Sequence, residues 1–170
     1  MKAQTSLILI VLLLVIMAGV AVFLLGFAQT VSQKDYFNLY THNLLLSVMR
    51  TDTGFTDNNC KLVSDLISCT FFFTDWICGN SGRTCYEIAN ETVSDYISNF
   101  ELIKKNFRYL FLVEPEGFTA RGPNPLVFEV GDKGLKTEKI EKFTANERIL
   151  RVTTTGQQYF LKVQLILAKR

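Results

Sequence analysis

Residues 7–28 read LILIVLLLVIMAGVAVFLLGFA, and this run sets the organisation of the whole chain. No charged side chain occurs from residue 3 to residue 33. A helix rises about 1.5 Å per residue, so about 20 apolar residues suffice to cross the hydrocarbon core of a bilayer. Buried helices of globular proteins rarely contain so long a run without a charge. The sequence therefore predicts one transmembrane helix near the N-terminus.

A cleaved secretory signal is the main alternative for this run. Such a signal has an apolar region of about 7–15 residues that ends at a site of small residues. Ala18, Gly19 and Ala21 offer small residues, but the apolar run continues past them through Leu25. We therefore favour an intact span over cleavage at this point. Lys2 lies before the run, which favours a cytoplasmic N-terminus and an outer location for the rest of the chain.

The helical pattern continues beyond the apolar run. Residues 29–50 contain neither Gly nor Pro, and their apolar side chains recur at three- and four-residue spacings. We expect one helix from about residue 5 to residue 50, ended by Asp52-Thr53-Gly54. Its first half is expected to lie in lipid, and its second half to pack against a folded domain. The residues of this apolar stripe are Tyr36, Phe37, Tyr40, Leu44, Leu45 and Val48.

The rest of the chain is long enough for one domain with its own core. Residues 55–84 form a cysteine-containing region with a short helix near residues 62–67, and residues 84–107 have the periodicity of a second helix. Between residues 109 and 167, short apolar runs alternate with turn residues, which predicts an antiparallel β-meander. The fold class is therefore α+β. The expected strands are residues 109–113, 126–130, 137–143, 148–154 and 159–167, and Thr155-Gly156 is expected at the tip of the last hairpin.

The four cysteines, Cys60, Cys69, Cys78 and Cys85, lie close together in the sequence. An even number of cysteines in an outer domain predicts disulfides. Their spacings lack the close ligand pairs of structural zinc sites, so no metal site is expected. If residues 62–68 are helical, Cys60 and Cys69 lie about 13 Å apart along the axis, too far for a bridge. We expect each of these two cysteines to bridge to Cys78 or Cys85, in an order that the sequence leaves open.

No sequence pattern predicts an enzyme or a cofactor. The only histidine, His42, lies on the long helix, and no nucleophile is accompanied by a base or by a G-x-S-x-G motif. Glu114 and Glu116 flank a proline in a turn, where solvated carboxylates are expected. The net charge of +2 without a basic run excludes an electrostatic nucleic-acid site. Asn90-Glu91-Thr92 is a glycosylation sequon that an outer domain could use.

Met1-Lys2-Ala3 is a very short basic segment, and Gln4-Thr5-Ser6 follows it directly before the apolar run. In this arrangement the chain resembles archaeal members of the type IV pilin superfamily, whose mature start carries a Q-x-S signature. Residues 43–54, with Cys60 and residues 63–67, are also similar to pilin-like surface proteins of archaea. The resemblance implies that residues 1–3 are a leader and that a prepilin peptidase cleaves between Ala3 and Gln4 on the cytoplasmic side.

The resemblance also implies a layout and partners for the mature chain. Residues 4–28 would form a helix held first in membrane lipid and later in a filament core against other pilin-like subunits. Residues 29–170 would form an extracellular α+β domain, in a surface filament with a role in adhesion. One position departs from the family, because Ile8 stands where its members usually carry a glutamate. This departure leaves open a minor or initiating subunit, or a protein that does not polymerise.

Two functions of different classes follow. The first is a pilin-like structural subunit that acts by helix packing and has no catalytic residues. The second is a stationary single-pass membrane-anchored ectodomain that binds a ligand or partner at the cell surface. An anchored enzyme is the least favoured alternative, because no catalytic pattern supports it.

Overall fold

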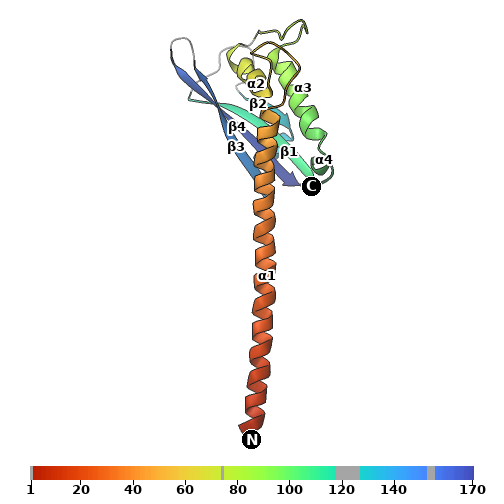
Figure 1. Ribbon diagram of the computed structural model, residues 1–170, viewed down its shortest axis with the longest axis vertical. Coiled ribbons are helices and arrows are strands. Elements are labelled where there is room, and N and C mark those ends of the chain that lie inside the picture. Colours follow the sequence, from red (N-terminus) through yellow and green to blue (C-terminus); the bar gives the residue numbers. More distant parts are fainter. Residues whose placement is uncertain (1, 74, 118–126, 153–155) are drawn as a thin grey trace. The chain divides into compact units, whose positions relative to one another are not determined.

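The computed structural model describes residues 2–73, 75–117, 127–152 and 156–170, and gives only the backbone of residues 2–9 and 27–32 (Figure 1). The chain divides into two compact units, Met1–Phe37 and Asn38–Arg170. We call them the N-terminal unit and the head unit and describe each by itself. Helix α1, Lys2–Met49, begins in the first unit and contributes its last residues to the second. Its bounds agree with the helix expected over residues 5–50.

The N-terminal unit consists of helix α1 up to Phe37. Within the part of the chain whose side chains are described, no helix reaches the length and apolarity needed to cross a membrane. The predicted span, residues 7–28, includes residues 7–9 and 27–28, whose side chains lie outside the described residues.

The head unit is an α+β structure, as predicted. Its helices pack beside an antiparallel sheet, and the last residues of α1 contribute Leu44, Leu45 and Val48 to the core. The predicted apolar stripe is therefore confirmed for these three residues. The elements that follow α1 are α2 (Val63–Phe72), α3 (Cys85–Ser98), α4 (Glu101–Asn106), β1 (Phe107–Glu116), β2 (Phe128–Gly131), η1 (Lys133–Lys136), β3 (Lys142–Val152) and β4 (Gln158–Lys169).

The single helix expected over residues 84–107 is wrong in one respect. Thr84 does cap its start, but α3 ends at Ser98 and a separate short helix, α4, begins at Glu101. Phe100 between them has an extended backbone, with ψ at 111°, and its ring packs edge-on against Tyr96 at 5.3 Å. The periodicity continued across this break because both short helices turn apolar side chains toward the same core.

The sheet has the strand order β2-β1-β4-β3, and all its pairs are antiparallel (Figure 1). The predicted meander is therefore wrong, since β1 pairs with the last strand, β4, as well as with β2. β1 and β4 contain the longest stretches of buried residues, and such strands favour the centre of a sheet. The strand expected over residues 137–143 is also wrong. Residues 133–136 form η1, and β3 starts only at Lys142.

The last two strands form the predicted hairpin. β3 pairs with β4 from Lys142↔Ala168 to Val152↔Gln158. Residues 153–155, which include part of the expected tip, lie outside the described residues, while Gly156 has a positive φ of 80°. A glycine adopts this backbone without a steric penalty, which explains its place at the turn.

Both faces of the sheet bury apolar side chains. On one face, helix α3 places Tyr86 edge-on against Phe128 of β2 at 5.5 Å, and α2 places Phe72 at 5.7 Å from Tyr159 of β4. On the other face, Leu135 of η1 closes a second cluster. That cluster contains Leu110, Leu112, Leu135, Ile166 and Ala168. The head unit thus completes its core with residues of its own.

Candidate assembly surface

The N-terminal unit exposes an apolar surface all round its helix. From Ile10 to Leu25 the large apolar side chains are 51 to 71 % exposed. A helix that is apolar on every side is normally buried in a larger core or in a membrane. Burial of one such side chain contributes about 1.5–3 kcal/mol, so this surface favours contact with lipid or protein. Its residues are Ile10, Val11, Leu12, Leu13, Leu14, Val15, Ile16, Met17, Val20, Val22, Phe23, Leu24 and Leu25. We call them the apolar sleeve.

Two glycines lie in or beside the apolar sleeve. Apart from the chain neighbours and the nearby backbone of the helix itself, no atom lies within 4 Å of the position that a Cβ would take at Gly19 or Gly26. Small residues on an apolar helix let a second helix approach closely, which increases van der Waals contact. The sleeve can therefore accept another helix at short distance, as well as lipid chains.

The residues named by the pilin resemblance lie at the start of α1. Ala3, Gln4 and Ile8 have helical backbones, and their side chains lie outside the described residues. Cleavage between Ala3 and Gln4 stays a prediction. Asn90 lies on α3 with an exposed side chain, so a glycan could reach it, and its glycosylation also stays a prediction.

The four cysteines form two disulfides, as predicted. Cys60 bridges to Cys78 and Cys69 bridges to Cys85, with Cα–Cα distances of 5.8 and 5.9 Å. Helix α2 carries Cys69, so a Cys60–Cys69 bond was correctly excluded. The two bridges also touch, because the Sγ of Cys85 lies 3.7 Å from that of Cys78. All four side chains are buried, and together they tie α2 and the start of α3 to the loops that precede them.

The loop tied down by Cys78 presents three exposed apolar residues. Phe73, Trp76 and Ile77 are 40, 42 and 51 % exposed, and we call them the aromatic patch. The indole N–H of Trp76 donates to Asp57 at 3.0 Å, which fixes the orientation of the ring. The guanidinium of Arg151 lies 5.4 Å from the centre of the Phe73 ring, within cation–π range.

Sequence reasoning missed the aromatic patch. Residues 71–73 and 76–77 were apolar without a clear period, so the sequence did not tell which of them are buried. Phe71 is buried inside α2, whereas Phe73 lies just past its end and is exposed. The polar partners Asp57 and Arg151 come from distant segments, and no local signal links them to this loop.

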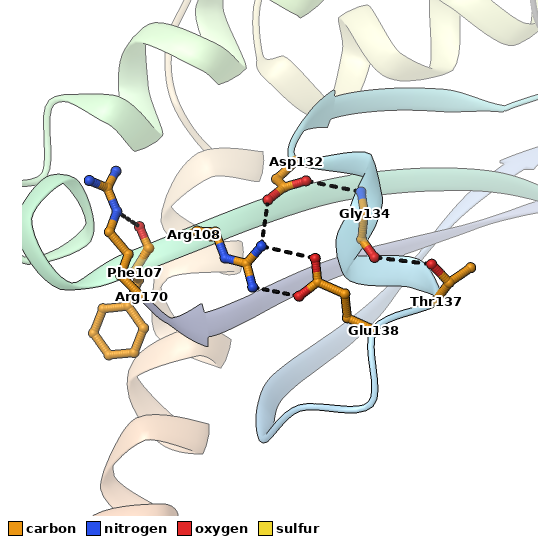
Figure 2. Close-up of polar contacts among 7 residues, drawn as sticks. All are labelled: Phe107, Arg108, Asp132, Gly134, Thr137, Glu138 and Arg170. Atoms are coloured by element: carbon orange, nitrogen blue, oxygen red, sulfur yellow. Dashed lines mark hydrogen bonds and ion pairs between the residues drawn. The ribbon is translucent and has the colours of Figure 1, made fainter.

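A second missed feature holds η1 against the sheet. Arg108 of β1 donates to Asp132 at 3.1 Å and to both carboxylate oxygens of Glu138 at 3.0 and 2.5 Å (Figure 2). Asp132 also accepts from the backbone N–H of Gly134 at 2.9 Å. The hydrogen bond from Arg108 lowers the pKa of Glu138, and the same contact raises the pKa of Arg108. Arg108 and Glu138 therefore stay charged near neutral pH, and their ion pair acts as a structural clamp between β1 and the segment that follows η1.

The lone histidine lies on the part of α1 that belongs to the head unit. His42 Nε2 is 3.8 Å from a carboxylate oxygen of Glu147 on β3, and both side chains are partly exposed. This contact joins the end of α1 to the edge strand of the sheet. Glu116, the other carboxylate considered in the sequence, accepts from Arg148 at 2.8 Å on the surface.

Comparisons of the chain with protein-family models, with curated proteins and with solved structures find no match. The function of the chain is therefore inferred from its own surfaces. Of the two apolar surfaces described above, the apolar sleeve contains more exposed residues than the aromatic patch.

Proposed function

We propose that the chain is a pilin-like structural subunit of an archaeal type IV pilus-like surface filament. The observation that supports this proposal most is the exposure of the apolar sleeve around the full circumference of α1. Such a surface needs partners on several sides, and a bundle of identical helices supplies them. Before assembly, membrane lipid would cover the same side chains. The head unit would then lie outside the cell and carry no catalytic role.

Three further features agree with this function. The Q-x-S sequence at residues 4–6 provides a start for the mature chain, and Lys2 supplies the basic leader residue. Two disulfides suit a domain on the oxidising side of the membrane. The head unit completes its own core, so it needs no neighbour to fold, and assembly can depend on the helix.

The alternative is a stationary membrane-anchored ectodomain that binds a partner at the cell surface. The aromatic patch favours it, because exposed aromatic side chains held in fixed orientations are common at binding surfaces. Position 8 also favours it, because this chain has Ile8 where the members of the pilin superfamily carry the glutamate that is associated with assembly. In this alternative the apolar sleeve stays in lipid and meets no other subunit.

The two functions predict different N-termini in the native host. A filament subunit should lose Met1-Lys2-Ala3 and begin at Gln4, whereas a stationary anchor should keep its leader. Intact-mass measurement of the chain purified from its own cells reads this difference directly. A host strain without prepilin peptidase is the control, and there the leader should remain. An intact leader in the normal strain would refute the filament proposal.

A further inference from the structure

A small hollow opens on the head unit where α3 and α4 end beside β1. Its volume is about 190 Å³, below the about 300–1,000 Å³ of sites for drug-sized ligands, so it suits a small ionic group. Two buried residues, Ile103 and Phe107, give it an apolar base. We call this site the basic hollow. Its other lining residues are polar, namely Ser98, Asn99, Lys104, Tyr109 and Arg170.

The basic hollow carries positive charge without a matching acid. Lys104 and Arg170 are its two cationic side chains, and none of its lining residues is acidic. Among the residues that the structure describes, no Asp or Glu side chain forms an ion pair with either of them. The neighbouring Glu101 is already paired with Lys105 at 3.2 Å. The hollow therefore favours an anion.

Two hydrogen bonds fix Arg170 at the basic hollow. Its backbone N–H donates to the carbonyl oxygen of Asn106 at 3.1 Å, and its Nε donates to the carbonyl oxygen of Phe107 at 3.3 Å (Figure 2). These bonds leave the two terminal nitrogens of the guanidinium for a ligand. The planar guanidinium can donate two parallel hydrogen bonds to the oxygens of one phosphate or carboxylate.

A glycine on the neighbouring strand makes room for Tyr109. A Cβ at Gly131 of β2 would lie 2.9 Å from two atoms of the Tyr109 ring, which is too close for any other residue. The φ of Gly131 is 104°, in the region that favours glycine. The ring can therefore lie directly against the backbone of β2, and Tyr109 adds its hydroxyl to the lining of the basic hollow.

We propose that the basic hollow binds a phosphate group, either on a soluble molecule or as the head group of a lipid. Four of its side chains can donate hydrogen bonds, those of Asn99, Lys104, Tyr109 and Arg170. A phosphate monoester offers three strong acceptor oxygens to these donors, whereas a carboxylate offers only two. All the residues belong to the head unit, so the inference is independent of the proposed filament function.

Binding of radiolabelled inorganic phosphate provides the test. The full chain in a nonionic detergent is dialysed to equilibrium against the labelled phosphate, with the ionic strength held constant by chloride. We expect saturable binding of one phosphate per chain, with displacement by glycerol phosphate and much weaker displacement by acetate. The absence of saturable binding would overturn the proposal, and so would displacement by acetate as strong as that by glycerol phosphate.

Three variants on α4 make the test specific. Lys104→Ala should weaken phosphate binding by about tenfold or more, because a hydrogen bond between charged groups contributes that much. Lys105→Ala, at the next position but outside the basic hollow, is the matched control and should bind as the natural chain does. Lys104→Arg keeps the charge and should retain binding, which separates a lost charge from a disturbed fold. Natural affinity in Lys104→Ala would contradict the proposal.

Two ligands with the same head group distinguish the sources of the phosphate. Glycerol phosphate and dihexanoyl phosphatidic acid both end in a phosphate monoester, and only the second carries acyl chains. Displacement of the labelled phosphate at a lower concentration of the lipid would support a lipid head group. Displacement at equal concentrations would support a soluble phosphorylated molecule. If neither ligand displaced the labelled phosphate, the proposed site would be wrong.

Discussion

Helix α1 carries two apolar surfaces, one exposed and the other buried. From Ile10 to Leu25 the apolar side chains cover every side of the helix and are exposed. In the head unit, Leu44 and Leu45 are buried, whereas the residue before them, Asn43, is exposed. His42 is partly buried. The second surface finds its partners within the chain, and the first finds none among the described residues. Apolar content alone therefore does not decide burial; the location of the partner does.

The largest expected effect comes from matched truncations on the two surfaces. Leu45→Ala removes a fully buried side chain and should destabilise the head unit by about 2–5 kcal/mol. Leu13→Ala, on the apolar sleeve, should leave the unfolding of the head unit within about 0.5 kcal/mol of the natural chain. The only tryptophan, Trp76, lies in the head unit and reports denaturant unfolding by fluorescence. If both variants lost the same free energy of unfolding, the two surfaces would contribute equally to the stability of the head unit, contrary to this prediction.

The second prediction concerns the disulfides that make the head unit self-sufficient. The Cys60–Cys78 bridge spans 18 residues, and its removal by paired substitution with serine should cost about 3 kcal/mol. The Cys69–Cys85 bridge spans 16 residues, so its paired serine variant should lose a similar amount. Helicity of the N-terminal unit in detergent should persist in both variants. In thermal melts, circular dichroism follows the helicity and Trp76 fluorescence follows the unfolding of the head unit. If both signals were lost together, the head unit and the N-terminal unit would not be independent in stability.

A smaller effect is expected at the start of α3. The hydroxyl of Thr84 accepts from the backbone N–H of Glu87 at 3.3 Å, and the backbone N–H of Thr84 donates to the Glu87 carboxylate at 2.9 Å. Thr84→Ala should therefore cost the head unit about 1 kcal/mol. Ser98→Ala, at the other end of the same helix, is the matched control. A cap variant as stable as this control would show that the disulfide at Cys85 alone fixes the helix start.

The smallest expected effect is pH-dependent and lies at the clamp on η1. Arg108 lowers the pKa of Glu138 below its usual value of 4.5, so the carboxylate stabilises the fold above that pH. This contribution is lost as the pH falls through the lowered pKa. Glu138→Gln should be less stable than the natural chain at pH 7, and the difference should vanish in acid. The melting temperatures of both chains are measured from pH 7 to acidic pH. If the difference in melting temperature stayed constant with pH, the ion pair would not be the cause of the difference in stability.

The sequence predicted those features that depend on local pattern. Helix α1, the stripe through Leu45 and the exclusion of a Cys60–Cys69 bridge all follow from helical geometry. It did not predict the pairing of β1 with β4, because that contact joins residues far apart in the chain and has no periodic signature. The bonds of Arg108 to Asp132 and Glu138 were missed for the same reason. The aromatic patch was missed because the end of α2 decides which phenylalanine is exposed.

The proposed filament requires the apolar sleeve to pack against the same surface of other subunits. Val15→Cys places a cysteine in the sleeve, and the natural cysteines are all bridged, so it is the single free thiol. A membrane-permeant oxidant is applied to material sheared from the native cells. We predict covalent dimers through Val15→Cys, whereas Lys162→Cys, exposed on the head unit, should stay monomeric and react with a thiol label. A chain that is absent from the sheared material, or monomeric there with Val15→Cys, would contradict the account.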